Sequence, residues 1–243
     1  MRAAILIIGS LLWDNDQRDS WRKSRLCIEN RMHVKAPIRY GRRSTSRGNT
    51  FTMTFRTEEV FGQVVLVPCV TVIGDVAGLV AEAEALWKAE QSSAATNSIG
   101  GSWGCVGVMF RTESTQAGLL AGWSSRFRVT ASAILPVDDA GILHIPWPVT
   151  TAEGRPADVD IVLATATKAE VNPPSVTEIA DAWIDQRHGH ERYFLENVRH
   201  GIRTPEDGLI WRRIEKQAPC WLRSAPHAEA VALLRAEAAG RVS

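Results

Sequence analysis

A run of six apolar residues close to the start of the chain, Ala3–Ile8, limits the fold more than any other feature of the sequence. The run is apolar without interruption and half of it is isoleucine, which is typical of a strand covered on both faces. Gly9 and Ser10 then end the strand and begin a turn. A signal peptide also begins with a charge and an apolar stretch, but Asp14–Asp16 stand where a small-residue cleavage site belongs. We therefore expect a buried strand.

The order of the other expected elements indicates the fold class. Strands are predicted at Met32–Tyr40, Thr50–Arg56, Phe61–Val67, Gly104–Phe110 and Val159–Thr167. Helices are predicted at Trp21–Leu26, Asp75–Gln91, Thr115–Trp123, Ser175–Gln186, His190–His200 and Thr204–Arg213, and from Pro226 onward. Strands come early and helices dominate late, which favours an α+β (mixed) fold over a doubly wound sheet.

Three segments have less regular patterns. Pro37 marks Met32–Tyr40 as an edge strand. The basic stretch Arg39–Arg47 that follows is expected to be a loop. The segments Phe127–Pro136 and Ile142–Pro146 are compatible with a hairpin.

Length and composition limit the number of domains and the kinds of partner. A chain of 243 residues fits one large domain or two small ones. We expect a single domain over residues 1–243, with a core over about 1–145 and a C-terminal extension over about 146–243. The 28 Lys and Arg nearly balance the 27 Asp and Glu, which gives no drive toward nucleic acid or a membrane surface. No apolar run approaches the roughly 20 residues of a membrane span.

The cysteines indicate a reducing compartment. They are Cys27, Cys69, Cys105 and Cys220, and no two of them form a C-x-x-C pair, which argues against a zinc ribbon or thioredoxin-like chemistry. An even count permits disulfides, but reduced thiols are the simpler interpretation. We expect a cytoplasmic protein.

Backbone amides after the first strand are the first candidate binding group. A strand that runs into a Gly-Ser turn can direct several N–H groups toward one point, and such a nest binds a carboxylate or a developing oxyanion. The residues concerned are Gly9, Ser10, Leu11, Leu12 and Trp13. An ordinary turn is the alternative, and it is favoured for this segment taken alone.

Glu90 is the candidate for proton transfer. Apolar residues of Asp75–Gln91 recur every three or four positions, which predicts an amphipathic helix with Glu90 on or beside its apolar face. A half-buried carboxyl group has a raised pKa and can move a proton near neutral pH. A solvated helix residue is the alternative, and spacing alone favours it.

Four arginines lie close together, at Arg39, Arg42, Arg43 and Arg47. Such a cluster can clamp a carboxylate or a phosphate, and a solvated loop is equally consistent with it. One short cluster in a chain of balanced charge argues against nucleic-acid binding.

A histidine-rich segment raises the question of a metal. His188, His190 and Glu191, with His200 further on, are compatible with an unrelated metalloprotein or hydrolase. However, the His-x-His pair begins a predicted helix and the His-Glu-x-x-His order is absent. Gly-x-Ser-x-Gly, the P-loop and Gly-x-Gly-x-x-Gly are absent too. We expect no metal and no cofactor, and the metal content of the purified protein would test this.

Four short motifs follow one another in an order known from one family. They are Ile8-Gly9-Ser10-Leu11-Leu12-Trp13, Arg42-Arg43-Ser44-Thr45-Ser46-Arg47-Gly48, Phe61-Gly62-Gln63-Val64-Val65 and Leu86-Trp87-Lys88-Ala89-Glu90. They resemble the Tyr-Gly-Ser-Leu-x-Trp turn, the Arg-rich segment, the Gly-containing strand and the Leu-x-x-x-Glu helix of the gamma-glutamylcyclotransferase-like family. The glutathione-specific cyclotransferase branch is the nearest resemblance, and it covers residues from about 3 to about 110.

The resemblance implies a fold and an activity. The fold is a small β-barrel or sheet with surrounding helices, followed here by a helical C-terminal extension. The activity releases 5-oxoproline from a gamma-glutamyl amide, whose own α-amine attacks the γ-carbonyl, so the expected partner is a small-molecule gamma-glutamyl substrate. The resemblance assigns proton transfer to Glu90, carboxylate and oxyanion binding to Gly9–Trp13, and a remote substrate carboxylate to Arg47.

The sequence departs from the family at the motifs themselves. Ile8 stands where the family has a tyrosine, and Trp87 and Ala89 replace an Asp and an Arg that are common before the catalytic Glu. The alternative is a non-catalytic protein that keeps the fold and binds a small molecule or a partner. For the predicted helices over Pro173–Gly201, a cover over the site, a specificity surface and a homodimer interface remain open.

Overall fold

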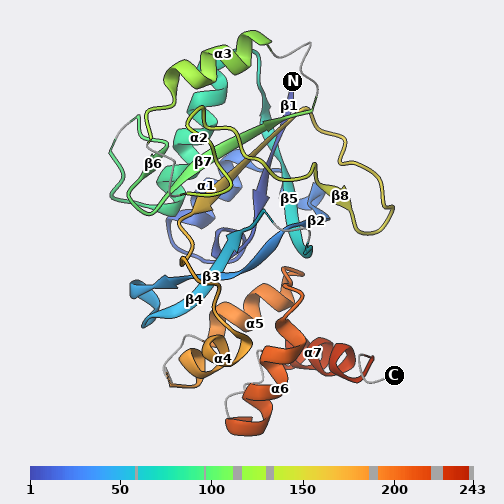
Figure 1. The fold of residues 1–243 in the computed structure, drawn as a ribbon. Helices are drawn as coiled ribbons and strands as arrows, with labels where there is room; N and C mark the ends of the chain where they lie inside the picture. Colours follow the sequence, from blue (N-terminus) through green and yellow to red (C-terminus); the bar gives the residue numbers. More distant parts are fainter. Residues whose placement is uncertain are drawn as a thin grey trace.

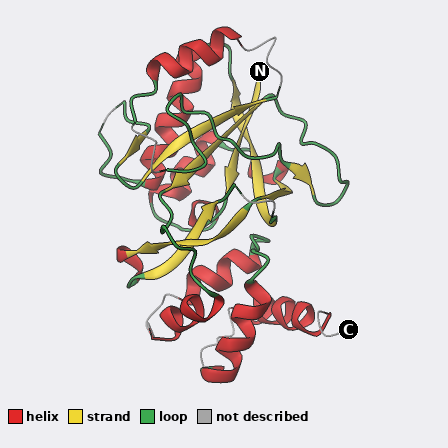
Figure 2. Cartoon of the chain, viewed as in Figure 1, coloured by secondary structure: helices red, strands yellow, loops and turns green. Residues whose placement is uncertain are grey.

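The computed structural model describes residues 1–57, 60–95, 97–111, 117–129, 134–185, 191–219 and 227–240. Over these residues the chain forms a seven-stranded sheet, a two-stranded sheet and seven α-helices. Figure 2 shows the strands gathered in one part of the molecule and the helices that include the C-terminus in another. The expected α+β (mixed) class is therefore confirmed.

The seven-stranded sheet has the predicted apolar strand at its centre. Its order is β6 (Gly100–Gly101), β7 (Gly104–Phe110), β9 (Ile161–Thr167), β1 (Arg2–Ile7), β5 (Gly62–Val72), β2 (Met32–Ala36) and β8 (Val149–Thr150). β1 runs parallel to β9, with Ile5 opposite Leu163, and antiparallel to β5. Every residue from Ala3 to Ile7 is buried, so the expected buried strand is confirmed.

Three helices pack beside this sheet, namely α1 (Gln17–Arg25), α2 (Val76–Glu90) and α3 (Ala117–Arg126) (Figure 1). The carboxylate of Asp75 caps α2 by accepting the Gly78 N–H at 2.8 Å. The buried face of α2 packs against β7 and β9; its residues are Leu79, Glu82, Ala83, Leu86, Trp87 and Ala89. The predicted amphipathic helix is thus confirmed, and Glu90 is its last residue.

The two-stranded sheet is built from the basic segment and its neighbour. β3 (Ile38–Ser44) pairs antiparallel with β4 (Thr50–Phe55), with Arg42 opposite Thr52. The connection passes through η3 (Thr45–Arg47) and two residues at positive φ, Gly48 and Asn49. The prediction of a loop over Arg39–Arg47 is therefore wrong, because pairing with the strongly strand-forming β4 outweighs the charged composition of β3. The single strand predicted over Met32–Tyr40 is also divided, at Pro37, into β2 and β3.

Four helices form the C-terminal part of the chain. They are α4 (Val176–Asp185), α5 (Glu191–Arg199), α6 (Asp207–Gln217) and α7 (Ala228–Gly240), and Figure 1 shows them together below β3 and β4. The ring of Trp183 on α4 lies 4.9 Å from that of Tyr40 on β3 and 5.0 Å from that of Phe194 on α5. Buried aromatic contacts therefore join these helices to the small sheet. A capping box begins α4, since Glu178 N–H donates to Ser175 Oγ and Ser175 N–H donates back to the Glu178 carboxylate.

The expected division near residue 146 does not fit the sheet. β9 lies between β1 and β7, so the core extends to Thr167 and the helical part begins at Val176. The sequence order of strands does not reveal which of them lies in the middle of a sheet. The hairpin considered over Phe127–Pro136 and Ile142–Pro146 falls partly on residues 130–133, outside the described residues. The described ones form isolated bridges there, such as Val137 with Leu143.

Two further expectations concern the thiols and the membrane. Cys27, Cys69 and Cys105 are free thiols, and Cys220 lies outside the described residues. Burial raises the pKa of Cys69 and of Cys105 to about 12, so neither is an activated thiolate at neutral pH.

Across the described ranges, no helix combines the length and the apolar character needed to cross a membrane.

Candidate functional site

A cavity of about 260 Å³ lies at the edge of the large sheet where β1 and β9 end. These two strands are parallel, so their carboxyl ends meet at the same edge, where open sheets commonly bind ligands. Ile8 and Gly9 enter the cavity from the end of β1, and Thr165 and Thr167 enter it from β9. The lining also includes residues from α1, the end of α2, the turn between β6 and β7, the small sheet with η3, and α5.

The turn after β1 presents unpaired backbone amides. Gly9, Ser10 and Leu11 all line the cavity, and the single turn η1 (Ser10–Leu12) is closed by the Leu12 N–H, which donates to the Gly9 carbonyl at 3.1 Å. The N–H groups of Gly9, Ser10 and Leu11 have no hydrogen-bond partner among the described residues. Such amides can bind an anionic oxygen.

The last two residues of the predicted binding segment have a different role. Leu12 and Trp13 are buried in the hydrophobic core and do not line the cavity. The indole N–H of Trp13 donates to Asn197 Oδ1 at 2.7 Å. Arg22 supports the turn from behind, since its guanidinium donates to the carbonyls of Leu11 at 2.6 Å and Asp14 at 2.8 Å.

Glu90 stands at the cavity wall with a perturbed carboxyl group. Its side chain is half-buried and lines the cavity. Burial raises the pKa of Glu90, and the positive charges of Arg18, Arg42 and Arg47 partly oppose that rise. The hydroxyl of Thr165 lies close enough to favour the ionised carboxylate, although it does not reach the geometry of a formed hydrogen bond. The solvated position that spacing alone favoured is therefore wrong.

Three arginines face the same cavity. Arg47 donates to Ser10 Oγ at 3.1 Å, and its guanidinium lies 4.8 Å from the centre of the Tyr193 ring. Arg18 forms ion pairs with Asp14 and Asp16. Arg42 stacks on Trp103 at 4.6 Å from the ring centre. Within the described part of the chain, Arg42 makes neither a hydrogen bond nor an ion pair through its guanidinium, so it is available to an anionic ligand.

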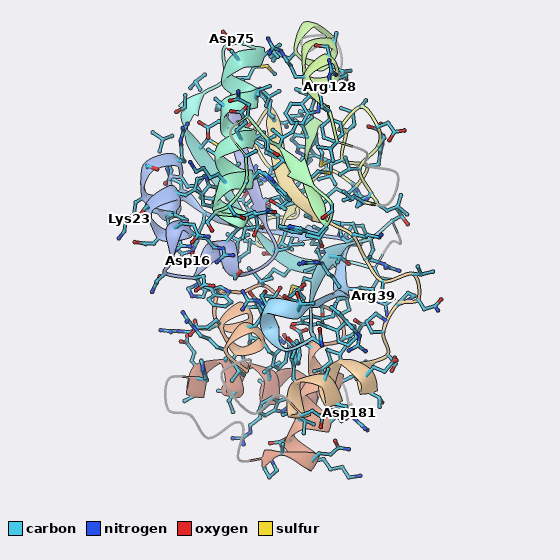
Figure 3. All side chains as sticks on the ribbon, turned by 90° about the vertical axis from the view of Figure 1, so that its left-hand side faces the viewer. Asp16, Lys23, Arg39, Asp75, Arg128 and Asp181 are labelled. Carbon is cyan, nitrogen blue, oxygen red and sulfur yellow. The ribbon has the colours of Figure 1, made fainter. Side chains whose placement is uncertain are left out.

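The other two arginines of the predicted basic cluster point elsewhere. Arg39 pairs with Glu206 in the C-terminal part of the chain, and Figure 3 shows Arg39 at the level where the sheets meet the C-terminal helices. Arg43 stacks on Phe51 at 4.3 Å. The cluster is therefore divided by the strand geometry of β3, with Arg42 and Arg47 at the cavity and Arg39 and Arg43 outside it.

Sequence reasoning missed several residues of the cavity, above all Tyr193. This residue belongs to α5 and its ring is buried. Its hydroxyl accepts the N–H of Met53 at 3.2 Å. A Cβ atom at Gly9 would lie only 2.9 Å from that hydroxyl oxygen. Arg18, Trp103, Thr165 and Thr167 were missed as well, because no local pattern links them to the Gly-Ser turn.

Most of the histidine-rich segment considered as a metal site lies outside the described residues. His188 and His190 lie outside the described residues, as does the side chain of Glu191. His200 lies 3.5 Å from Glu196, a separation set within α5 and its C-terminal end. Within the ranges that are described, no group of three His, Cys, Asp or Glu residues could hold a metal ion.

A second cavity, of about 430 Å³, lies between β5 and the C-terminal helices and is lined by residues that include Lys35, Gln63 and Arg203. Its arginine is already paired, since Arg203 contacts Asp207 at 3.1 Å and Glu237 at 2.6 Å. The first cavity, by contrast, combines unpaired donors with a perturbed carboxyl group, which is the combination expected of a reaction site.

Comparison of the chain with known proteins finds no relative. No protein-family model matches the chain, and no curated protein and no solved structure matches it either. The class of the site must therefore be argued from its own residues.

Proposed function

We propose that the cavity at Gly9 and Glu90 is the active site of a gamma-glutamylcyclotransferase-like enzyme that releases 5-oxoproline from a gamma-glutamyl amide. One observation carries the proposal: the carboxyl group of Glu90 lines the same cavity as the unpaired amides of Gly9, Ser10 and Leu11. The proposal includes the fold of that family, which the order of motifs between about residue 3 and about residue 110 supports.

The reaction needs no nucleophile from the protein. The α-amine nitrogen of the substrate forms a bond to the γ-carbonyl carbon, and the amide C–N bond then breaks. The proton lost by the attacking amine ends on the leaving amine, and the Glu90 carboxylate carries it between them. A raised pKa suits this role, because the group must both accept and return a proton near neutral pH.

The remaining donors hold the negative charges of substrate and transition state. The unpaired amides of Gly9, Ser10 and Leu11 stabilise the oxygen of the attacked carbonyl. Arg42 and Arg47 bind substrate carboxylates, which orients the amine toward the carbonyl. Arg18 pairs with Asp14 and Asp16, and Arg47 lies 3.7 Å from Asp14. Arg42, which has no such pair among the described residues, is therefore the arginine that most favours an anionic ligand.

A non-catalytic binding protein is the second candidate, and Ile8 favours it. This residue places an apolar side chain in the cavity, at the position where the family has a tyrosine hydroxyl. The arginines and amides bind an anion equally well in a protein that performs no reaction. Product formation separates the two candidates.

The decisive experiment is a chromatographic assay for 5-oxoproline with gamma-glutamyl amino acids, gamma-glutamyl amines and glutathione as substrates. We expect product from the wild type and at least about a 100-fold lower rate from Glu90→Gln. Glu84→Gln is the matched control, since Glu84 lies on the same helix outside the cavity. Equal rates for Glu90→Gln and wild type would remove Glu90 from the mechanism. No product from any substrate would leave the binding protein as the function.

A further inference from the structure

Among the described residues of the C-terminal helices, Tyr193 of α5 is the one that lines the cavity. We propose that the phenol of Tyr193 donates a hydrogen bond to the anionic oxygen of the ligand that is held beside Gly9. The C-terminal helices then complete the active site instead of only covering it. In the proposed reaction, on which this assignment of the oxygen rests, that oxygen belongs to the attacked γ-carbonyl.

The position of the Tyr193 ring is fixed from two sides. The Arg47 guanidinium lies 4.8 Å from its centre, and the Trp13 ring meets it edge-on at 6.1 Å with an interplanar angle of 62°. Trp13 is itself anchored to Asn197 on the same helix. A donor held in place before the ligand arrives stabilises developing charge without a cost of reorganisation.

The hydroxyl oxygen already accepts from the protein, whereas its hydrogen has no acceptor. Met53 N–H donates to the oxygen at 3.2 Å. The side chain of Asn197, whose Nδ2 makes no hydrogen bond with the described residues, lies close enough to oppose the rise that burial causes in the pKa of the phenol. None of the described residues accepts the phenol hydrogen. Since a hydroxyl group has one proton to donate, the cavity is the direction that remains.

Two threonine hydroxyl groups in the same cavity also lack a hydrogen-bond partner. Thr165 and Thr167 are 5% and 9% exposed and line the cavity, and neither Oγ1 atom has a hydrogen-bond partner in the described structure. Buried polar groups are nearly always paired, so such orphans call for a missing partner. A ligand with several oxygen atoms, seated between Gly9 and Glu90, would satisfy all three hydroxyl groups.

The chain has only two tyrosines, which provides a matched pair of variants. Tyr40 is also buried, lies outside the cavity and has an unpaired hydroxyl, so Tyr40→Phe removes the same atom without touching the site. We expect Tyr193→Phe to lower kcat by about 100-fold, with KM changed less than about threefold. Its melting temperature should fall below that of Tyr40→Phe, because the N–H of Met53 loses its acceptor, but the variant should remain folded at the temperature of the assay. An unchanged kcat in Tyr193→Phe would overturn the proposal.

A second measurement separates this inference from the proposed reaction. The protein is labelled with ¹³Cζ-tyrosine, the two resonances are assigned with Tyr40→Phe, and L-glutamate is added while calorimetry records its binding. We expect the Tyr193 resonance to shift and the Tyr40 resonance to stay, and Tyr193→Phe to bind L-glutamate about 10-fold more weakly. If this is observed without 5-oxoproline formation, the reaction is wrong and the contact stands. Binding that leaves the Tyr193 resonance unshifted, or no binding of L-glutamate, overturns the contact.

Discussion

The indole N–H of Trp13 donates to the side-chain oxygen of Asn197 across 184 positions of sequence, at 2.7 Å and buried from solvent. This bond joins the turn after β1 to α5, the helix that carries Tyr193. Both side chains are buried, so if one of them is lost, water cannot take its place as the hydrogen-bond partner of the other. The binding turn and the C-terminal helices are therefore held in one arrangement.

Asn197→Ala should loosen this arrangement. The indole N–H is left buried without an acceptor, which costs about 1–3 kcal/mol of the free energy of unfolding. Because Tyr193 and the turn lose their common anchor, we expect the rate of product formation to fall as well. Urea denaturation and initial rates measure the two effects. Asn30→Ala, at an exposed position, is the control and should stay within about 0.5 kcal/mol of wild type. A stable, fully active Asn197→Ala protein would show that the bond has no such role.

The pH dependence of the reaction should follow Glu90. The proposed step needs the ionised carboxylate, so kcat/KM falls as the pH drops through the pKa of Glu90, which burial raises above that of an ordinary glutamate. Arg42 stabilises the ionised form. In Arg42→Gln the pKa of Glu90 therefore rises further, and the acidic limb of the profile moves to higher pH.

Arg43→Gln is the control for that shift, since the Arg43 side chain stacks on Phe51 outside the cavity. We expect its profile to coincide with that of the wild type after scaling. A limb that moves to lower pH in Arg42→Gln, or that moves equally in both variants, would contradict the assignment of the limb to Glu90.

A double-mutant cycle tests the close approach of Gly9 to Tyr193. An added Cβ at Gly9 would lie 2.9 Å from the Tyr193 hydroxyl oxygen and 3.7 Å from the nearest ring carbons. Gly9→Ala should therefore destabilise the protein by about 1–3 kcal/mol. Adding Tyr193→Phe removes the obstructing oxygen, so the double variant should recover at least about 1 kcal/mol relative to additive behaviour.

Gly74→Ala is the control for this cycle, because a Cβ there meets no atom within 4 Å. Chemical denaturation of the four proteins of the cycle, with Gly74→Ala beside them, measures the coupling. If the changes in the free energy of unfolding for Gly9→Ala and Tyr193→Phe are strictly additive, an added Cβ at Gly9 does not clash with the Tyr193 hydroxyl.

Part of the candidate site could be predicted from sequence because it depends on local patterns. The Gly-Ser turn after an apolar strand, and Glu90 at the edge of a helix face, are readable from neighbouring residues. The structure places Gly9, Ser10, Leu11, Arg47 and Glu90 at one cavity. Leu12 and Trp13 were included with them. However, the segment forms a 3₁₀ turn, in which successive side chains point in different directions around the axis, and Leu12 and Trp13 are buried in the core.

The remainder could not be predicted because it depends on contacts between distant segments. Tyr193 reaches Gly9 only after the C-terminal helices pack on the small sheet. Thr165 lines the cavity only because β9 lies beside β1. The basic segment was misjudged for the same reason: whether Arg42 lies on a loop or a strand depends on β4 as its partner.

The central place of β9 has a consequence for how the chain folds. Ala3 pairs with Ile161, so β1 finds one of its two neighbours only after the long segment between these two residues, which includes β7, has been synthesised. Until then β1 and β7 each present an open edge with unpaired backbone groups, which is the kind of edge that promotes association between chains. Pairings of such long range also slow folding. The newly made protein therefore passes through a stage in which it most needs protection from other chains.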